Sequence, residues 1–389
     1  MSESNGKPLH FTWLGLVNWR NFTRVDDISL AGRAFLVGPN ASGKSNLLDV
    51  FRFLRDLSSV GGGFQSAVAT RGGVSSLRSL AARRYSDIEI KVSLGDRTSP
   101  KAWQYVLGFN QDNRRRAIIR TERVLRNGNE ILKRPDEKDN EDPERLTQTY
   151  LEQVYANKDF RDVTEFFASV SYYHVVPQLI REPDRSTGHT NDPFGGDFLE
   201  QVAKTSERTR AARLRKMREA LRVVVPQLQE LELTKDDRGT PHLRGRYENW
   251  RPHGAWQTED HFSDGTLRLL GLLWSAQSGT GPLLLEEPEL SLHPEAVRYI
   301  PQMFARVQRK TGRQIFVSTH SPDLLKDDGI GLDEVFLLQP SAEGTTVTPA
   351  GSLHEIRDLL NSGCVLSDVV MPRTRPANVQ QLALFPDLP

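Results

Sequence analysis

The stretch AFLVGPNASGKSNLL, residues 34–48, decides the fold. Its apolar start predicts a buried strand, its middle matches the pattern G-x-x-x-x-G-K-S, and apolar residues at helical spacing follow. Glycines let such a loop wrap a phosphate, because backbone N–H groups and the helix N-terminus then face the anion. A chance glycine-rich turn is the alternative, and the strand and helix on either side disfavour it.

The residues expected to hold the phosphates are Gly38, Pro39, Asn40, Ala41, Ser42, Gly43, Lys44, Ser45 and Asn46. Lys44 is expected to contact the β- and γ-phosphates, and the Ser45 hydroxyl is expected to ligate Mg²⁺.

A second motif, PLLLEEPELSLHP at 282–294, places two carboxylates at the end of another short apolar strand. Ligands in open α/β sheets bind at this end of the strands. Glu286 is expected to hold Mg²⁺ through water, and Glu287 to position or polarise an attacking water. An acidic surface turn is the alternative. It is disfavoured because the loop at 38–46 supplies phosphate contacts, whereas this motif supplies the carboxylates that a phosphate-cleaving site also needs.

Two further motifs carry polar groups at element ends. His320 follows the apolar run 315–317 and is a candidate for contact with the γ-phosphate and the catalytic water. Ser263 and Gly265 open a helix, where a hydroxyl and backbone N–H groups make an anion site. Alone, this last pattern is only a helix-capping signal.

Together the four motifs resemble the ABC-type ATPases of the RecF, SMC and overcoming-lysogenization-defect (OLD) group, and most of all stand-alone bacterial ATPases of the AAA family. The resemblance covers residues 9–57 and 255–340 well and the middle poorly. It implies an α/β P-loop NTPase head of the ABC type, with an antiparallel N-terminal sheet and a helical insertion. It also implies ATP and Mg²⁺ as cofactors, with ATP held between two heads.

The resemblance assigns roles to individual residues. The loop at 38–45 matches Walker A, Glu286 and Glu287 match Walker B and the catalytic glutamate, and His320 matches the switch histidine. Ser263 and Gly265 match a degenerate signature motif that would complete the site of the partner head.

Two further assignments come from the same resemblance: Arg20 would approach the nucleotide, and Gln178 is the candidate Q-loop glutamine, which would contact nucleotide and metal. The chain departs from the family in two ways. Glu286 replaces the usual Asp, and the signature lacks its second Gly and its Gln.

The expected organisation is an N-terminal part of the head at 8–176, a loop and helical insertion at 177–227, a C-terminal part at 228–370 and a disordered tail at 371–389. Loops are expected at 58–76, from the Gly and Ser content, and at 133–144, from the charged composition. One helix is predicted at 295–309 and a β-like run at 169–176.

The net charge of the chain bears on whether it is a nucleic-acid-binding protein. The 389 residues contain 51 Lys and Arg against 50 Asp and Glu, which excludes a strongly basic nucleic-acid binder by bulk charge. An arginine cluster at 208–222 could track a DNA backbone, although a solvated face or protein interface is favoured. No apolar leader or membrane-spanning run occurs, so we expect a cytoplasmic protein without membrane contact.

Expected partners are a second copy of the chain, DNA, and a separate nuclease-like or TOPRIM-type protein, because too few residues follow the switch strand for a C-terminal nuclease domain. The tail resembles a motif that binds the replication sliding clamp: Gln381 would bond at the pocket edge, while Leu382, Leu384 and Phe385 would fill apolar pockets. Folding back onto the head is an equally favoured alternative.

The function predicted is an ATP-binding and ATP-hydrolysing switch that dimerises on ATP, in DNA repair or phage defence. One alternative is the ATPase subunit of a transporter, but the resemblance to such subunits implies about half of the 225-residue separation from Gly38 to Ser263. The other is a non-catalytic, nucleotide-gated scaffold.

Overall fold

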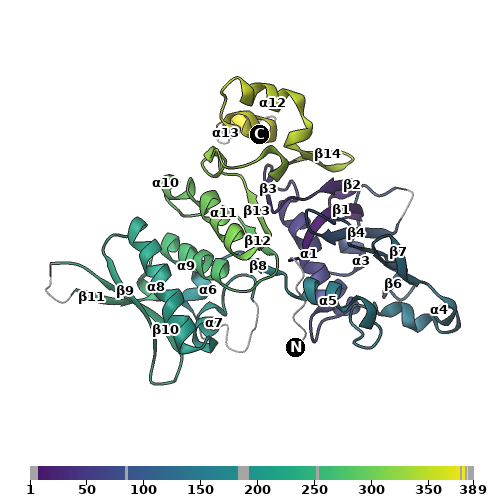
Figure 1. Ribbon diagram of the computed structural model, residues 1–389, viewed down its shortest axis with the longest axis horizontal. Coiled ribbons are helices and arrows are strands. Elements are labelled where there is room, and N and C mark those ends of the chain that lie inside the picture. Colours follow the sequence, from purple (N-terminus) through teal and green to yellow (C-terminus); the bar gives the residue numbers. More distant parts are fainter. Residues whose placement is uncertain are drawn as a thin grey trace.

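The computed structural model describes residues 8–83, 86–182, 192–250, 254–376, 379–381 and 383. The loop at 38–43 follows β3, a central strand of a six-stranded sheet ordered β15-β14-β3-β13-β12-β8 (Figure 1). These strands are β3 (Arg33–Val37), β8 (Ser171–Tyr173), β12 (Leu283–Glu286), β13 (Ile315–Thr319), β14 (Val335–Ser341) and β15 (Gly344–Pro349). All neighbouring pairs except β14 and β15 are parallel, so the carboxyl ends of β3, β12 and β13 meet at one edge.

A second six-stranded sheet is antiparallel, in the order β2-β1-β4-β5-β6-β7. Its strands are β1 (His10–Trp19), β2 (Phe22–Ser29), β4 (Ile88–Gly95), β5 (Trp103–Gln111), β6 (Ala117–Arg126) and β7 (Asn129–Arg134). Helix α1 (Lys44–Ser58) lies between the two sheets. Its Phe51 ring packs 4.6 Å from Phe11 of the antiparallel sheet and 4.6 Å from Phe316 of the parallel sheet, measured between ring centroids.

The parallel sheet has a separate core on each face, because side chains alternate along a strand. Leu36, Leu284 and Phe316 join the core around α1, whereas Phe35 and Leu285 join a second core on the opposite face. The second core includes α7 (Phe198–Lys204), α8 (Glu207–Val224), α9 (Asp264–Gln277), α10 (Pro294–Val297) and α11 (Ile300–Thr311).

A three-stranded sheet, ordered β11-β10-β9, accompanies these helices, with β10 near α7 and β9 against α8 (Figure 1). The strands are β9 (Leu228–Lys235), β10 (Pro241–Tyr247) and β11 (Ala255–Thr258). The remaining α-helices are α2 (Phe64–Ala69), α3 (Val74–Leu77), α4 (Glu137–Glu141), α5 (Arg161–Ala168), α6 (Pro177–Arg181), α12 (His354–Asn361) and α13 (Leu366–Val370).

Two predicted loops are wrong. The stretch 58–76 contains α2 and α3, and its glycines precede helices: Gly63 and Gly73, at φ 122° and 86°, are their N-caps. The stretch 133–144 contains the end of β7 and helix α4. It is not solvated throughout, because Arg134 is buried and pairs with Glu122 and Asp139 at 2.8 and 2.9 Å.

Three other boundaries differ from expectation. The helix predicted at 295–309 is two helices, α10 and α11, and Pro301 lacks the N–H that a continuous helix would need. The β-like run at 169–176 is a strand only over β8. Met371–Thr374, predicted as part of a disordered tail, forms a short 3-10 helix with Thr374 buried. The predicted docking residues Leu382, Leu384 and Phe385 lie outside the described residues.

Candidate functional site

The loop between β3 and α1 has a conformation suited to wrapping an anion. The Lys44 ammonium donates to the carbonyl oxygens of Gly38 and Pro39 at 3.0 and 3.1 Å, across the mouth of the loop. Gly43 has φ 91°, and a Cβ on Gly38 would lie 2.7 Å from the Leu338 carbonyl oxygen. Both positions therefore require glycine. Burial lowers the pKa of the Lys44 ammonium, although the nearby carboxylates act in the opposite direction.

Asn21, in the turn between β1 and β2, fastens this loop to the antiparallel sheet. Its side-chain N–H donates to the Ser42 carbonyl at 3.0 Å, and it accepts from the Asn46 amide at 2.9 Å. A Cβ on Gly43 would lie 2.1 Å from the Asn21 amide nitrogen. Sequence reasoning assigned no role to Asn21, because a polar residue in a hairpin turn carries no sign of a partner distant in sequence.

Glu286 ends β12 and joins the loop to a third element. One carboxylate oxygen accepts a hydrogen bond from the Ser45 hydroxyl, and the other accepts from the Tyr172 hydroxyl of β8. Burial and the adjacent Glu286 charge raise the pKa of Tyr172, so it remains a donor. Tyr172 was missed from the sequence; its pairing with Leu284 across neighbouring strands brings it here.

Glu287 and His320 form a second pair at the same edge. The Glu287 carboxylate lies 3.0 Å from His320 Nδ1, and the Glu287 amide donates to the Ser318 carbonyl at 3.0 Å. Glu287 adopts φ 43°, a left-handed conformation that is uncommon outside glycine. Such strain persists where surrounding contacts impose it, as the bond to Ser318 does here.

Glu289 is a buried carboxyl group behind this pair. One of its oxygens accepts from the Thr319 hydroxyl, while the other is buried without a hydrogen-bond partner among the described residues. Burial raises the pKa of Glu289. The burial of Glu289 could not be predicted, since an acidic residue after Pro288 is expected to face solvent.

Ser263 and Gly265 stand at the N-terminus of α9, apart from the loop. Ser263 is the N-cap, accepts from the Thr266 amide at 3.2 Å and is exposed. A Cβ on Gly265 would lie 2.6 Å from the Ser291 carbonyl oxygen, so glycine lets residues 290–293 approach α9. Among the described residues, no hydrogen bond or ion pair joins this pair to residues 38–46.

The loop at 38–46, Glu286, Glu287 and His320 lie within the region matched by a known family. The family model described as "AAA domain, putative AbiEii toxin, Type IV TA system" matches residues 33–326. The chain belongs to this AAA family. The family match and the fold together show a P-loop domain of the AAA ATPase family with the fold of an Smc head.

Solved structures show the same fold at low sequence identity. The AAA chain is 14% identical to an Smc head bound to the C-winged helix domain of ScpA, with a TM-score of 0.54, covering 87% of this chain and 97% of that one. It is 11% identical to a Pyrococcus furiosus Smc head with an extended coiled coil, bound to the C-terminal domain of ScpA, with a TM-score of 0.52, covering 91% and 100%. No curated protein matches significantly.

The residues at this site are suited to binding ATP and Mg²⁺, which ATPases of this family typically use. Among the described residues, no group of three or more His, Cys, Asp or Glu side chains could hold a metal. Mg²⁺ needs no such group, because it keeps several waters and binds through one or two protein ligands plus phosphates. Ser45 and Glu286 supply such a pair, and the buried Ser42 hydroxyl lacks a partner inside the loop.

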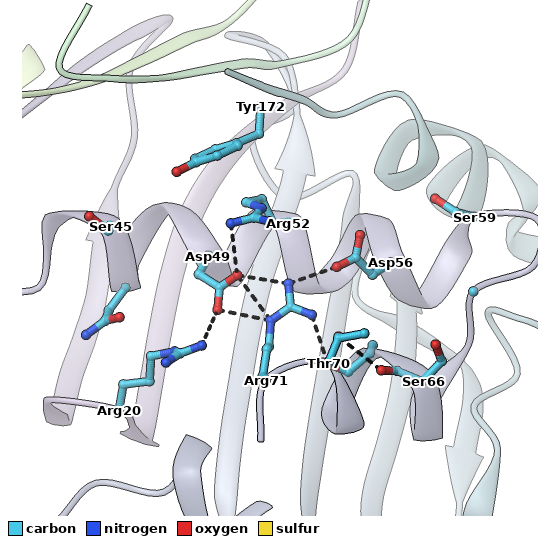
Figure 2. A pocket seen from close by; sticks show the side chains of 13 residues that line it. Arg20, Ser45, Asp49, Arg52, Asp56, Ser59, Ser66, Thr70, Arg71 and Tyr172 are labelled. Atoms are coloured by element: carbon cyan, nitrogen blue, oxygen red, sulfur yellow. Dashed lines mark hydrogen bonds and ion pairs between the residues drawn. The ribbon is translucent and has the colours of Figure 1, made fainter. Parts of the chain in front are cut away.

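A cavity of about 520 Å³ extends along α1 from Ser45 towards Ser59 (Figure 2). Arg20 lines it and donates to Asp49 at 2.9 Å. Burial alone would raise the pKa of Asp49, but the positive charges of Arg71 and Arg20 lower it. Arg20 thus shares this cavity with Ser45, and its charge is partly engaged by Asp49.

Gln178 does not join these groups. It lies in α6 with an exposed side chain, and no hydrogen bond links it to Ser45 or Glu286 in the described part of the chain. From this segment, Tyr172 is the residue that reaches Glu286.

No described helix is long and apolar enough to cross a membrane.

Proposed function

We propose that the protein binds and hydrolyses ATP with Mg²⁺ and works as a nucleotide-driven switch. One observation carries this proposal. The Glu287–His320 pair, the Ser45–Glu286 contact and the Lys44 loop lie at the carboxyl ends of three adjacent parallel strands. Phosphate binding, metal binding and activation of water need these groups side by side.

Different side chains bind the phosphates, hold the metal and activate the water. Lys44 and the backbone amides of the loop bind the β- and γ-phosphates, while Ser45 and Glu286 hold the metal, which neutralises phosphate charge. The Glu287 carboxylate accepts the proton of the attacking water. His320, 3.0 Å away, keeps that carboxylate oriented.

We assign the second half of the site to another copy of the chain. Ser263 and Gly265 present a helix N-terminus to solvent and do not contact their own loop. A helix N-terminus attracts an anion, so the γ-phosphate of a second head is a suitable partner. ATP would then join two heads, and hydrolysis would release them.

The proposal extends to DNA or a nuclease-like partner, in DNA repair or phage defence. The resemblance to RecF and OLD proteins supports it, and the similar Smc heads are bound to ScpA. Docking of Gln381 and the tail on a sliding clamp, and metal contact by Gln178, remain predictions.

Lys44→Ala and Glu287→Gln test the function. Lys44→Ala should abolish binding of a fluorescent ATP analogue. Glu287→Gln should bind normally but hydrolyse at least about 100-fold more slowly, because a general base contributes that much. Light scattering after gel filtration should show its ATP-bound dimer accumulating. Turnover of Glu287→Gln at the normal rate would show that another group activates the water.

A further inference from the structure

An apolar groove lies on the helical side of the molecule, away from the phosphate-binding loop. It has a volume of about 630 Å³ between α8, α9 and α11. Val223, Leu273, Met303 and Val307 are among its apolar lining residues. Val223 is 82% exposed and Tyr299 63% exposed, so large apolar side chains meet solvent here. An exposed apolar surface of this kind marks an interaction site more often than chance exposure does.

The charged side chains that line the groove are all cations. The charged residues lining it are Arg306 and Lys310, with no acidic lining residue in the described part of the chain. Helix α11 carries three cations, Arg306, Arg309 and Lys310, and no acid. Arg222, which directly precedes Val223 on α8, is also exposed. A nearly neutral chain thus places a local positive rim around an apolar floor.

Part of the arginine cluster on α8 is already engaged elsewhere. Arg213 donates to the Ser278 hydroxyl at 3.1 Å and lies 4.9 Å from the ring centroid of Trp274. Arg210 donates to the carbonyls of Ala203 and Thr205, both at 3.2 Å. These two arginines are thus engaged by their own chain and do not line the groove.

We infer that this groove binds an amphipathic helix of a partner protein, with its apolar stripe on Val223, Leu273 and Met303 and its acidic flanks against Arg306 and Lys310. Helices bind in grooves through apolar side chains spaced three or four residues apart. Carboxylates on the helix flanks would complement the rim, which favours correct pairing and fast association. The proposal goes beyond ATP hydrolysis and does not depend on it.

Other occupants fit less well. A DNA backbone would satisfy the cations but would leave the valine, leucine and methionine floor without an apolar partner. A symmetric contact with a second copy would place like charges together, because both grooves carry Arg306 and Lys310.

The groove also touches elements of the candidate ATP site. Leu269 and Leu273 belong to α9, whose N-terminus carries Ser263, and Leu292 belongs to the segment after Glu289. A helix seated here would contact both elements. Any effect on ATP turnover rests on the proposed function, whereas binding itself does not.

The test measures binding of a labelled synthetic peptide, without nucleotide, by fluorescence anisotropy. The probe is an amphipathic helix of about 16 residues, or about 24 Å, with leucines on one face and glutamates on the flanks. A matched peptide carries lysine in place of glutamate. The wild-type protein should bind the glutamate peptide at least about tenfold more tightly than the lysine peptide, a difference of about 1.4 kcal/mol.

Variants locate the site. Val223→Asp and Met303→Glu should each weaken binding about tenfold or more, since groove residues at an interface centre dominate affinity. Val60→Asp, at a fully exposed valine after α1, is the control and should bind normally. Arg306→Glu combined with Lys310→Glu should reverse the preference toward the lysine peptide. Thermal melts establish that each variant is folded, and Val223→Asp alters only an exposed side chain.

Three outcomes would overturn the proposal. The first is equal or absent binding of the two peptides by wild type. The second is a nucleotide-free dimer, seen by sedimentation, that Val223→Asp converts to monomer, which would make the groove a self-association face. The third is a DNA duplex that displaces the peptide and whose binding needs Arg306 and Lys310 but tolerates Val223→Asp.

Discussion

Tyr172 and Ser45 each donate to one oxygen of Glu286, so the carboxylate that we propose holds Mg²⁺ is oriented from two sides. Tyr172→Phe removes one of these bonds without changing the ring. A hydrogen bond to a charged group contributes about 1.5–3 kcal/mol. We therefore expect the Mg²⁺ concentration for half-maximal ATP turnover to rise about tenfold, with unfolding by urea little changed. Tyr173→Phe, at the next position, is the control; an equal effect there would exclude a specific role for Tyr172.

Glu289 makes stability depend on pH in a direction that can be worked out. Its pKa is raised above the ordinary 4.5 by burial, so protonation favours the folded state. Its stabilising contribution is complete below pH 4.5 and is lost as pH rises through the folded pKa. Glu289→Gln is neutral at every pH. Its stability relative to wild type should therefore increase as pH rises above about 4.5, measured by urea unfolding. A difference independent of pH would contradict the shift.

At the scale of elements, the strands and helices around residues 34–48, 283–286 and 315–319 could be predicted because their apolar runs end in recognisable motifs. Arg134 shows why the end of β7 and helix α4, within 133–144, could not be predicted. Its charged neighbours resemble a solvated loop, and nothing local reveals that Glu122, on the adjacent strand β6, will pair with it. Tyr172 and Glu289 escaped prediction for the same reason, since their partners lie on other strands.

The Arg134 pairs fasten α4 to the antiparallel sheet, and their removal should be costly. Arg134→Ala leaves the buried carboxylates of Glu122 and Asp139 without their shared cation. Breaking a buried ion pair costs about 3–5 kcal/mol, which guanidinium or urea unfolding can measure. Arg123→Ala removes a partly exposed pair with Glu130 and should cost less than about 1 kcal/mol. Similar losses in the two variants would argue against a structural role for the buried network.

At the scale of the whole molecule, the separation of Ser263 from the loop at 38–46 makes one copy an incomplete enzyme in our proposal. Two disabled variants should then repair each other. Lys44→Ala has a defective loop and an intact α9 N-terminus, whereas Ser263→Arg has the reverse.

A heterodimer of the two contains one site built from the Ser263→Arg loop and the Lys44→Ala α9, and this site is whole. The other site of that heterodimer carries both defects. Random pairing makes half of the dimers mixed, each with one whole site of two, so an equimolar mixture should recover about a quarter of wild-type ATP turnover. Each variant alone should be inactive. If Ser263→Arg alone hydrolyses ATP normally, or if mixing recovers nothing, the site is completed within one chain or by a different surface, and the α9 N-terminus is only a helix cap.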